Sequence, residues 1–451
     1  MTLTSVARYE PEQLSSVGDH AVVVGASMAG LCAARVLADG FEDVTVIERD
    51  PLPDEPIARR GVPQANHIHV LQEAGRATLT DLFPDFGENL LSAGGLVLDG
   101  TRDLKMYDEG DFNADSPHRI PVYSATRPLY ESVVRRSVTT LDNVQMRSEC
   151  QLITFLTDEE VTAVEGVIVK PAGRQSEELP ADLVIDTTGR TSHTPTWLKE
   201  HGYPSPPTDE VRINVTYSTT FIERPSDDRH GILVVPSAPR TRGGAFLPVE
   251  NDQWQVTLFG MHGDHPPADL DGFREYTASF PIPHHKRLLD EYPQTTEEIV
   301  QYPFPSNMRR RYEDLDRSPD GLVVLGDAIA SFNPIYGQGM SVAALEALEL
   351  HHALAAGGRE DLPSRVFERI KQTVDIAWSM AVGADVQFPQ TEGPKPRSAD
   401  VLNWYLTRLI RKAHTDGMLF DAFFRVQMME QPPSSLFRPR IMWRVLRPTG
   451  G

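Results

Sequence analysis

The hydrophobic positions near the start of the chain predict a strand–helix–strand unit. Ala21–Val24 is a continuous apolar run, which is typical of a strand buried in a parallel sheet. Met28–Asp39 is rich in alanine and is followed by Gly40, so it predicts a helix that ends at a glycine. Val44–Glu48 predicts a second buried strand. We expect the two strands to be parallel and joined by a right-handed crossover.

The middle of the chain has a different pattern. Val211–Phe221 alternates between apolar and polar residues, as expected of a half-exposed antiparallel strand. Ile232–Val235 predicts a further strand, and Gly244–Val249 and Trp254–Phe259 flank the turn residues 250–253. The last two segments therefore predict a hairpin within an inserted antiparallel sheet.

The first pattern then returns twice. Asp182–Asp186 and Leu322–Leu325 are short buried strands, and each leads into a polar, glycine-containing turn. A long helix is predicted from about Gly339, and the remainder of the chain has a helical pattern. These segments indicate an α/β fold interrupted by an antiparallel insertion.

Composition and charge exclude several classes of protein. The chain has 451 residues, 40% of them hydrophobic, and a net charge of −21. The apolar content is enough for packed cores, and the negative charge argues against nucleic acid and anionic lipid as partners. Two cysteines imply no disulfide framework, and we find no signal peptide and no apolar stretch that could span a bilayer. We expect a soluble cytoplasmic protein whose membrane contact is at most peripheral.

The first candidate for chemistry is the loop Gly25–Gly30, which follows a strand and opens a helix. Gly25 allows a tight turn, and Gly30 allows close packing of helix and strand. Ser27 stands where the usual pattern has a middle glycine, but its hydroxyl is small and can donate to a phosphate. Glu48 lies about 20 residues further on, at the end of the next strand, where a carboxylate can bind a ribose. Together these features predict dinucleotide binding; the alternative is a packing turn followed by an ordinary strand-end glutamate.

The second candidate is longer and more specific. Gly326-Asp327-Ala328 is followed by Asn333-Pro334 and then by Gly337-Gln338-Gly339-Met340-Ser341. A carboxylate after a buried strand can bind a chain of hydroxyl groups, and the N–H groups of a helix start can hold a partly anionic ring edge. The alternative is a second glycine-rich turn between a strand and a helix.

Four stretches together resemble the FAD-dependent monooxygenases of the p-hydroxybenzoate hydroxylase type, within the group that includes squalene epoxidase. They are GASMAG (25–30) with Glu48, RRGVPQ (59–64) with His67 and His69, DLVIDTTGR (182–190), and GLVVLGDAIASFNPIYGQGMSVA (321–343). The second and fourth stretches are most similar to the bacterial polyether epoxidases of the monensin and lasalocid kind. The resemblance extends from about residue 18 to 360.

The resemblance implies a role for individual residues. Glu48 would bind the adenosine ribose, Asp327 the ribityl chain, and Arg59 and Arg127 would contact FAD. The helix start after Gly337 would stabilise negative charge on the reduced ring. The full set of expected cofactor-binding residues is Gly25, Ser27, Gly30, Glu48, Arg49, Arg59, Arg127, Asp327, Pro334, Gly337, Gly339 and Met340.

The fold class that follows is α/β (α+β overall), with three parts. A Rossmann-like FAD-binding domain is expected to be split over residues 18–84, 122–200 and 300–360. A substrate domain with the antiparallel sheet would comprise residues 85–121 and 201–299, and a helical C-terminal region residues 361–451.

The resemblance also implies the reaction. Reduced FAD would react with dioxygen to form a C4a-hydroperoxide, which transfers one oxygen atom to an apolar organic substrate such as a polyene, a terpenoid or an aromatic compound. We expect alkene epoxidation in secondary metabolism; the alternative is aromatic hydroxylation, for which we identify no base in the sequence. No second dinucleotide loop is present, so NAD(P)H would deliver electrons either directly or through a separate flavin reductase. No catalytic residue is assigned.

Three other functions occur on similar scaffolds. A flavin-dependent halogenase is expected to carry a W-x-W-x-I-P motif, which none of the five tryptophans provides. A flavin-dependent prenyl reductase would share the fold but would not consume oxygen with its substrate. A non-enzymatic prenyl-carrier protein of the GDP-dissociation-inhibitor kind would not require the intact glycine and acid set described above.

Several side chains outside the loops carry further expectations. His67 and His69 could share one face of a strand and bind a metal, but no third ligand cluster is evident, so we expect them to line the flavin or substrate cavity. Cys32 is expected to be a small helix-packing residue, and Arg309–Arg311 a solvated face. The inward faces of the inserted sheet, on the side of the substrate, are expected to carry Val215, Tyr217, Phe246, Leu247 and Phe259.

Overall fold

The computed structural model describes residues 3–395 and 399–448. Its first layer is a five-stranded, fully parallel sheet. Four of its strands correspond to the buried strands predicted at residues 21–24, 44–48, 182–186 and 322–325, and the fifth was not predicted. In spatial order the strands are β17 (Leu322–Val324), β11 (Leu183–Asp186), β1 (Gly18–Val24), β2 (Phe41–Ile47) and β7 (Val144–Arg147).

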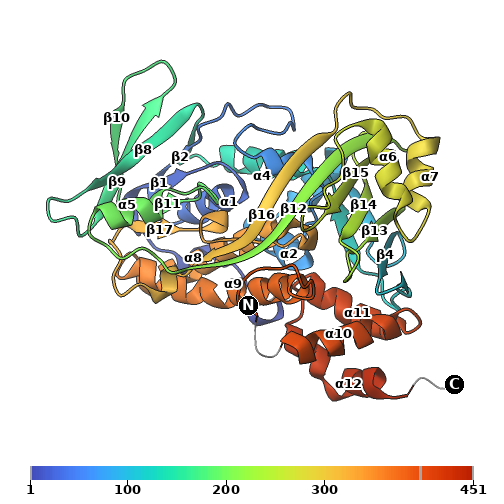
Figure 1. Ribbon diagram of the computed structural model, residues 1–451. Helices are drawn as coiled ribbons and strands as arrows, with labels where there is room; N and C mark the ends of the chain where they lie inside the picture. Colours follow the sequence, from blue (N-terminus) through green and yellow to red (C-terminus); the bar gives the residue numbers. More distant parts are fainter. Residues whose placement is uncertain (1–2, 396–398, 449–451) are drawn as a thin grey trace.

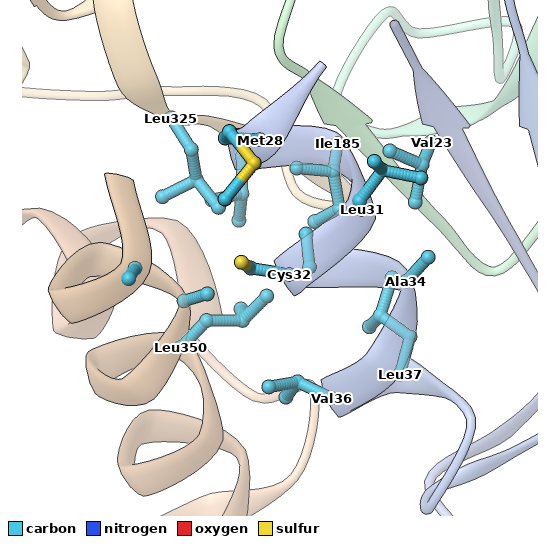
Figure 2. Close-up of a cluster of buried hydrophobic side chains, with 14 of the residues drawn as sticks. Val23, Met28, Leu31, Cys32, Ala34, Val36, Leu37, Ile185, Leu325 and Leu350 are labelled. Atoms are coloured by element: carbon cyan, nitrogen blue, oxygen red, sulfur yellow. The ribbon is translucent and has the colours of Figure 1, made fainter. Parts of the chain in front are cut away.

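Helix α1 (Met28–Leu37) covers this sheet and packs against the long helix α8 (Gly339–Gly357). Both helices are apolar over most of their surface, because each is enclosed by other elements. Figure 2 shows Cys32 on α1 with its sulfur on the side of α8, among Leu31, Val36 and Leu350. The prediction that Cys32 is a packing residue is confirmed, and burial raises the pKa of its thiol to about 12.

A small antiparallel sheet forms the layer beyond the parallel sheet, and its presence was not predicted. It consists of β8 (Cys150–Thr157), β9 (Val164–Pro171) and β10 (Glu177–Pro180). β9 contacts β11, and β8 contacts β2. Figure 1 shows these strands above the parallel sheet, with α8 and α9 (Leu362–Asp385) below it.

The inserted sheet has eight strands among the described residues, and the predicted hairpin is confirmed by the antiparallel pairing of β14 (Arg242–Val249) with β15 (Gln253–Gly260). β16 (Val300–Arg310) pairs with β12 (Thr208–Glu223) along most of its length, so residues 300–310 extend this sheet rather than the parallel one. In spatial order the strands are β18 (Ala330–Ser331), β16 (Val300–Arg310), β12 (Thr208–Glu223), β15 (Gln253–Gly260), β14 (Arg242–Val249), β13 (Gly231–Val234), β4 (Leu104–Asp108) and β5 (Asp111–Phe112).

The arginines at the end of β16 are not a solvated face, so that prediction is wrong for two of the three. Arg309 is 1% exposed and pairs with Glu313 at 2.5 Å and with Asp375 at 2.5 Å. Arg310 is also buried and donates to the backbone oxygen of Ala328. They are buried because β16 runs into the junction between the two sheets, where α9 and β18 cover its end.

The remaining elements cover the two sheets, and the predicted helical C-terminus is confirmed for its described residues. No helix formed by residues 3–395 or 399–448 combines the length and the apolar character needed to cross a membrane. The elements are α2 (Glu73–Leu82), α3 (Phe86–Ser92), β3 (Leu96–Asp99), β6 (Pro121–Ser124), α4 (Arg127–Thr139), α5 (Thr194–Glu200), α6 (Leu270–Ala278), α7 (His284–Glu291), α10 (Ala399–Ala413), α11 (Gly417–Gln427) and α12 (Pro439–Leu446).

Candidate functional site

A cavity of about 650 Å³ lies at the carboxyl ends of the parallel strands, where ligands bind in open α/β sheets. It reaches from the loop after β1 to the start of α8, so it joins the two motifs that are about 300 residues apart in the sequence. Two of the twelve predicted residues, Gly30 and Arg59, do not line it. The other ten do: Gly25, Ser27, Glu48, Arg49, Arg127, Asp327, Pro334, Gly337, Gly339 and Met340.

Gly30 supports the cavity from behind. A Cβ atom at this position would lie 1.8 Å from the backbone oxygen of Gly25 and 2.8 Å from the hydroxyl of Thr187. No side chain fits such a space, so Gly30 is needed for the close approach of α1 to the end of β1. The predicted packing role of this glycine agrees with the geometry.

Glu48 ends β2, and the surrounding backbone fixes its carboxylate. One oxygen accepts a hydrogen bond from Ala26 N at 3.0 Å, and the other accepts one from Asp50 N at 3.0 Å. Arg59 adds a charged partner, with its Nη1 2.9 Å from the first of these oxygens. Glu48 therefore ties the glycine loop to the next strand while it lines the cavity.

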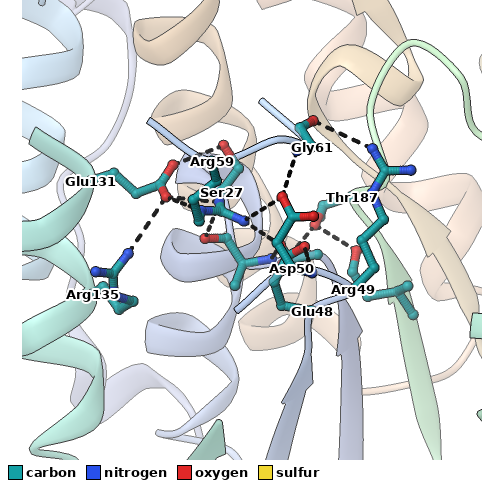
Figure 3. A network of polar contacts seen from close by, with 12 residues as sticks. Ser27, Glu48, Arg49, Asp50, Arg59, Gly61, Glu131, Arg135 and Thr187 are labelled. Carbon is teal, nitrogen blue, oxygen red and sulfur yellow. Dashed lines mark hydrogen bonds and ion pairs between the residues drawn. The ribbon is translucent and has the colours of Figure 1, made fainter. Parts of the chain in front are cut away.

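Glu131 on α4 is the centre of a buried ion-pair network beside this loop, shown in Figure 3. It pairs with Arg59 at 2.7 Å, with Arg127 at 3.1 Å and with Arg135 at 3.6 Å. Burial raises its pKa, but the positive charges of Arg127 and Arg59 outweigh burial and hold that pKa below its ordinary value. We did not predict Glu131, although its spacing of four residues from two arginines on one helix was a visible signal.

Arg127 connects this network to the glycine loop. Its Nη2 donates to the Ser27 hydroxyl at 2.8 Å, and that hydroxyl lies 3.3 Å from Glu131 Oε2. The Ser27 side chain therefore makes no capping hydrogen bond at the start of α1. Ser27, Met28 and Arg127 all line the cavity, which places a helix start and a guanidinium on the same wall. Such a wall suits a phosphate group.

The second half of the cavity begins at Asp327, whose carboxylate faces the space rather than a protein partner. Among the described residues, no hydrogen bond or ion pair reaches its side chain. Burial raises its pKa, and the charges of Arg190 and Arg127 counteract this only in part. Directly behind it, Glu346 on α8 accepts a hydrogen bond from Gly326 N at 2.5 Å, and burial raises the pKa of Glu346 to about 8.

The loop from Asn333 to Gly339 is held from behind by a second buried acid, Asp385 at the end of α9. Its carboxylate accepts hydrogen bonds from Asn333 Nδ2 at 2.9 Å, Tyr336 OH at 2.8 Å and Asn307 Nδ2 at 2.7 Å. Burial raises its pKa to about 6. The loop then turns at Gly337, whose φ of +65° is a conformation that favours glycine. Sequence reasoning missed Asp385, because nothing local to α9 points to this loop.

Gln338 is the clearest sign that this loop is built for a ligand. It is 1% exposed and lines the cavity, yet neither its amide oxygen nor its amide nitrogen has a hydrogen-bond partner among the described residues. A buried amide without partners is costly, so a polar ligand group in the cavity would stabilise it.

The two histidines have different positions. His69 lines the cavity, as predicted, and its Nδ1 donates to the backbone oxygen of His67 at 2.9 Å. His67 lies behind the wall, with its Nδ1 2.7 Å from the Thr219 hydroxyl, so the prediction that it lines the cavity is wrong. Burial lowers the pKa of His69 to about 4 and that of His67 to about 3. Within the described residues, no group of three or more His, Cys, Asp or Glu side chains could hold a metal ion.

The inserted sheet contributes to the cavity through β16 and not through the strands that we expected. Tyr302 and Phe304 of β16 line it, together with Phe332. The five predicted residues Val215, Tyr217, Phe246, Leu247 and Phe259 do not line it. They belong instead to the sheet's own packing, where four of them are buried. The predicted half-exposed alternation holds only for residues 211–215, because residues 216–220 are buried on both faces of the strand.

The residues present fit FAD. Glu48, Ser27, Arg127, Asp327 and the start of α8 all line the one cavity. A ribose, a pyrophosphate, a ribityl chain and a flavin ring require groups of these kinds. The unpartnered Gln338 amide and the unpaired Asp327 carboxylate are independent signs of a polar ligand.

Known proteins support this assignment. Residues 19–372 match the family described as FAD binding domain. Protein Rv3254 of Mycobacterium tuberculosis is 34% identical over 90% of this chain and 89% of its own length. Kynurenine 3-monooxygenase of Salinispora tropica is 24% identical over 75% of this chain and 73% of its own length.

A solved structure shows the same fold across nearly the whole chain. The flavoprotein/dehydrogenase from Cytophaga hutchinsonii superposes with a TM-score of 0.67, at 14% identity, over 94% of this chain and 96% of its own. The family match covers both halves of the cavity, from the loop after β1 to α8. The chain belongs to the FAD binding domain family and is an FAD-dependent monooxygenase.

Proposed function

We propose that the enzyme inserts one oxygen atom from dioxygen into an apolar organic substrate, by alkene epoxidation in secondary metabolism. The observation that carries this proposal is the apolar character of the cavity near α8. The cavity that the start of α8 lines is also lined by Tyr302, Phe304, Phe332, Ile68 and Val70. Such a lining favours a polyene or terpenoid over a charged metabolite, and it excludes water from the reacting groups.

The residues around the cavity would hold the cofactor by complementary charge. Glu48 would accept hydrogen bonds from a ribose, and Asp327 from the ribityl chain. Arg127 and the start of α1 would bind the pyrophosphate, and the start of α8 would stabilise negative charge on the reduced ring. Bound FAD would supply the redox chemistry that activates dioxygen. NAD(P)H would deliver the electrons, either directly or through a separate flavin reductase.

His69 bears on the choice between epoxidation and aromatic hydroxylation. Because a backbone carbonyl can only accept, its Nδ1 carries the proton, and Nε2 is left as an acceptor. With a pKa of about 4 this ring is neutral at pH 7 and is a weak base. A phenol, with a pKa near 10, would gain little help in ionising. The weak basicity of His69 therefore favours an alkene as the substrate. Hydroxylation of an amino-substituted aromatic ring is the second candidate, which the name of the kynurenine relative suggests.

Labelled oxygen tests the proposal. The FAD-loaded enzyme would be supplied with NADPH or NADH, with and without a flavin reductase, under oxygen-18 gas and with a panel of polyenes, terpenoids and aromatic amines. We expect a product heavier by one oxygen-18 atom, with an epoxide from the alkene members. Saturated product formed without oxygen uptake would instead identify a prenyl reductase.

The cytoplasmic location also remains a proposal, which localisation of the tagged protein in its host would test.

A further inference from the structure

The exposed apolar side chains are concentrated at the C-terminal end of the molecule. Among the described residues, eight large apolar side chains are exposed, and five of these lie between residues 401 and 446. Trp404 on α10 is 58% exposed and Trp443 on α12 is 64% exposed. Isolated apolar residues on a surface are normal. Five of them within less than 50 residues, including two tryptophans, indicate an interaction surface.

The two helices that carry this patch lie side by side, as Figure 1 shows. Tyr405 of α10 stacks on Phe437, which precedes α12, with ring centres 4.9 Å apart. Further along, Arg408 of α10 donates to the backbone oxygen of Val445 at 2.8 Å. We define the C-terminal apolar–basic surface as Val401, Trp404, Phe437, Arg438, Arg440, Trp443, Leu446 and Arg447, all of which are exposed.

The charge of this region is opposite to that of the whole molecule. Residues 399–448 contain eight lysines and arginines and four acidic residues, whereas the chain as a whole has a net charge of −21. Within the described residues, no ion pair reaches Arg438 or Arg440, whereas Arg447 pairs with Asp416 at 3.8 Å and lies over the Trp443 ring at 5.1 Å. Exposed arginines beside exposed tryptophans are suited to an anionic, partly apolar surface.

We propose that the C-terminal apolar–basic surface docks the enzyme on an anionic lipid bilayer. α12 would lie in the plane of the interface, with Trp443 and Leu446 entering the headgroup region and Arg438, Arg440 and Arg447 contacting lipid phosphates. The rest of the protein, being strongly acidic, would be repelled from the same membrane, which fixes the orientation. This attachment is peripheral and stands independently of the substrate proposed above.

Vesicle sedimentation of the full-length protein tests this proposal. We would compare vesicles of phosphatidylcholine alone with vesicles of equal parts phosphatidylcholine and phosphatidylglycerol, at low ionic strength and at about 0.5 M salt. We expect binding to the mixed vesicles only, and its loss at high salt. Failure to bind the mixed vesicles at low ionic strength would overturn the proposal.

Two variants separate the apolar and the basic contributions. The double variant Trp404→Ser/Trp443→Ser should bind the mixed vesicles at least about tenfold more weakly. Replacing Arg438 and Arg440 by Gln should weaken binding by roughly fivefold for each charge. Thermal unfolding should be unchanged, because both side chains are exposed and neither has an ion-pair partner among the described residues. Leu91→Ser, an exposed leucine on α3, is the matched control and should bind like the wild type.

Two results would contradict lipid docking. Equal binding by the wild type and the tryptophan variant would show that the surface does not contact the vesicle. A shift of the tryptophan variant to a smaller oligomer in light scattering, without vesicles, would show that the surface is covered by a second copy of the chain.

Discussion

The two halves of the cavity are stabilised in opposite ways. Around the loop after β1, the charged groups are paired: Glu48 and Glu131 are both in contact with Arg59, and Glu131 also with Arg127. Around Asp327, Glu346 and Asp385 the part of the chain that the structure describes provides no cation at contact distance, and burial raises the pKa values of all three acids. The first half is therefore a frame of paired charges, whereas in the second half Asp327 and the Gln338 amide have no hydrogen-bond partner among the described residues.

Removal of Glu131 should have the largest effect on this comparison. Glu131→Ala would leave Arg59, Arg127 and Arg135 buried without their shared acid, and we expect a loss of about 3–5 kcal/mol in the free energy of unfolding. Chemical denaturation measures this. The matched control is Glu177→Ala, which removes an exposed partner of Arg147 and should cost less than about 1 kcal/mol. Similar losses for the two variants would show that the network is not a structural frame.

Asp385→Ala should have the next largest effect, about 2–4 kcal/mol in the free energy of unfolding, because three donors lose their acceptor. Tyr336→Phe removes only one of these hydrogen bonds and should cost about 1 kcal/mol. Flavin fluorescence of the loaded variants would show whether the loop in front of Asp385 has moved. An Asp385 variant as stable as the wild type would contradict the anchoring role.

Asp327→Asn should lower the affinity for FAD without lowering the free energy of unfolding. We expect FAD affinity to fall at least about tenfold, while the unfolding free energy of the FAD-free protein is unchanged or higher, since a buried unpaired charge has been removed. Isothermal titration and denaturation of the same preparation give both quantities. Asp320→Asn, outside the cavity, serves as the control. Equal affinity of Asp327→Asn and the wild type would exclude this carboxylate from the flavin site.

Glu346→Gln should cause the smallest loss of stability, because glutamine resembles the protonated side chain, and it should change how stability depends on pH. Because the folded-state pKa of about 8 lies above the ordinary value of 4.5, the contribution of Glu346 to stability is fully present below pH 4.5 and is lost progressively as the pH rises through 8. In the glutamine variant, the free energy of unfolding should fall less as the pH rises. The part of the fall that comes from Asp385, whose pKa is about 6, should remain. Unfolding free energies between pH 5 and 9 test this, and identical pH profiles would contradict it.

The sequence predicted most of the fold because the relevant signals are local. The buried strands, the long helix and the hairpin follow from apolar runs and alternation within a few residues. The sheet of β8, β9 and β10 was missed, since its half-exposed strands lack a strong pattern. The domain boundaries are still untested. Residues 300–310 were assigned to the FAD-binding domain, although their strand β16 pairs with β12 of the inserted sheet.

The candidate site was predictable where a motif carries it and not where distant elements meet. Asp327 and Glu48 were found from their motifs, and both line the cavity. Asp385 acts through hydrogen bonds to residues more than 45 positions away, so no local pattern reveals it. The tryptophans of the C-terminal surface were likewise not distinguishable from core residues, because exposure of a helix face depends on what packs against it.

The most direct test of a single FAD site spanning both halves is to titrate FAD and FMN into the FAD-free Glu48→Gln variant and the wild type. FMN lacks the adenosine part that Glu48 is proposed to hold. We predict that the variant loses at least about tenfold in affinity for FAD and none for FMN. An equal loss for both flavins, or no loss for either, would contradict the assignment of the two halves.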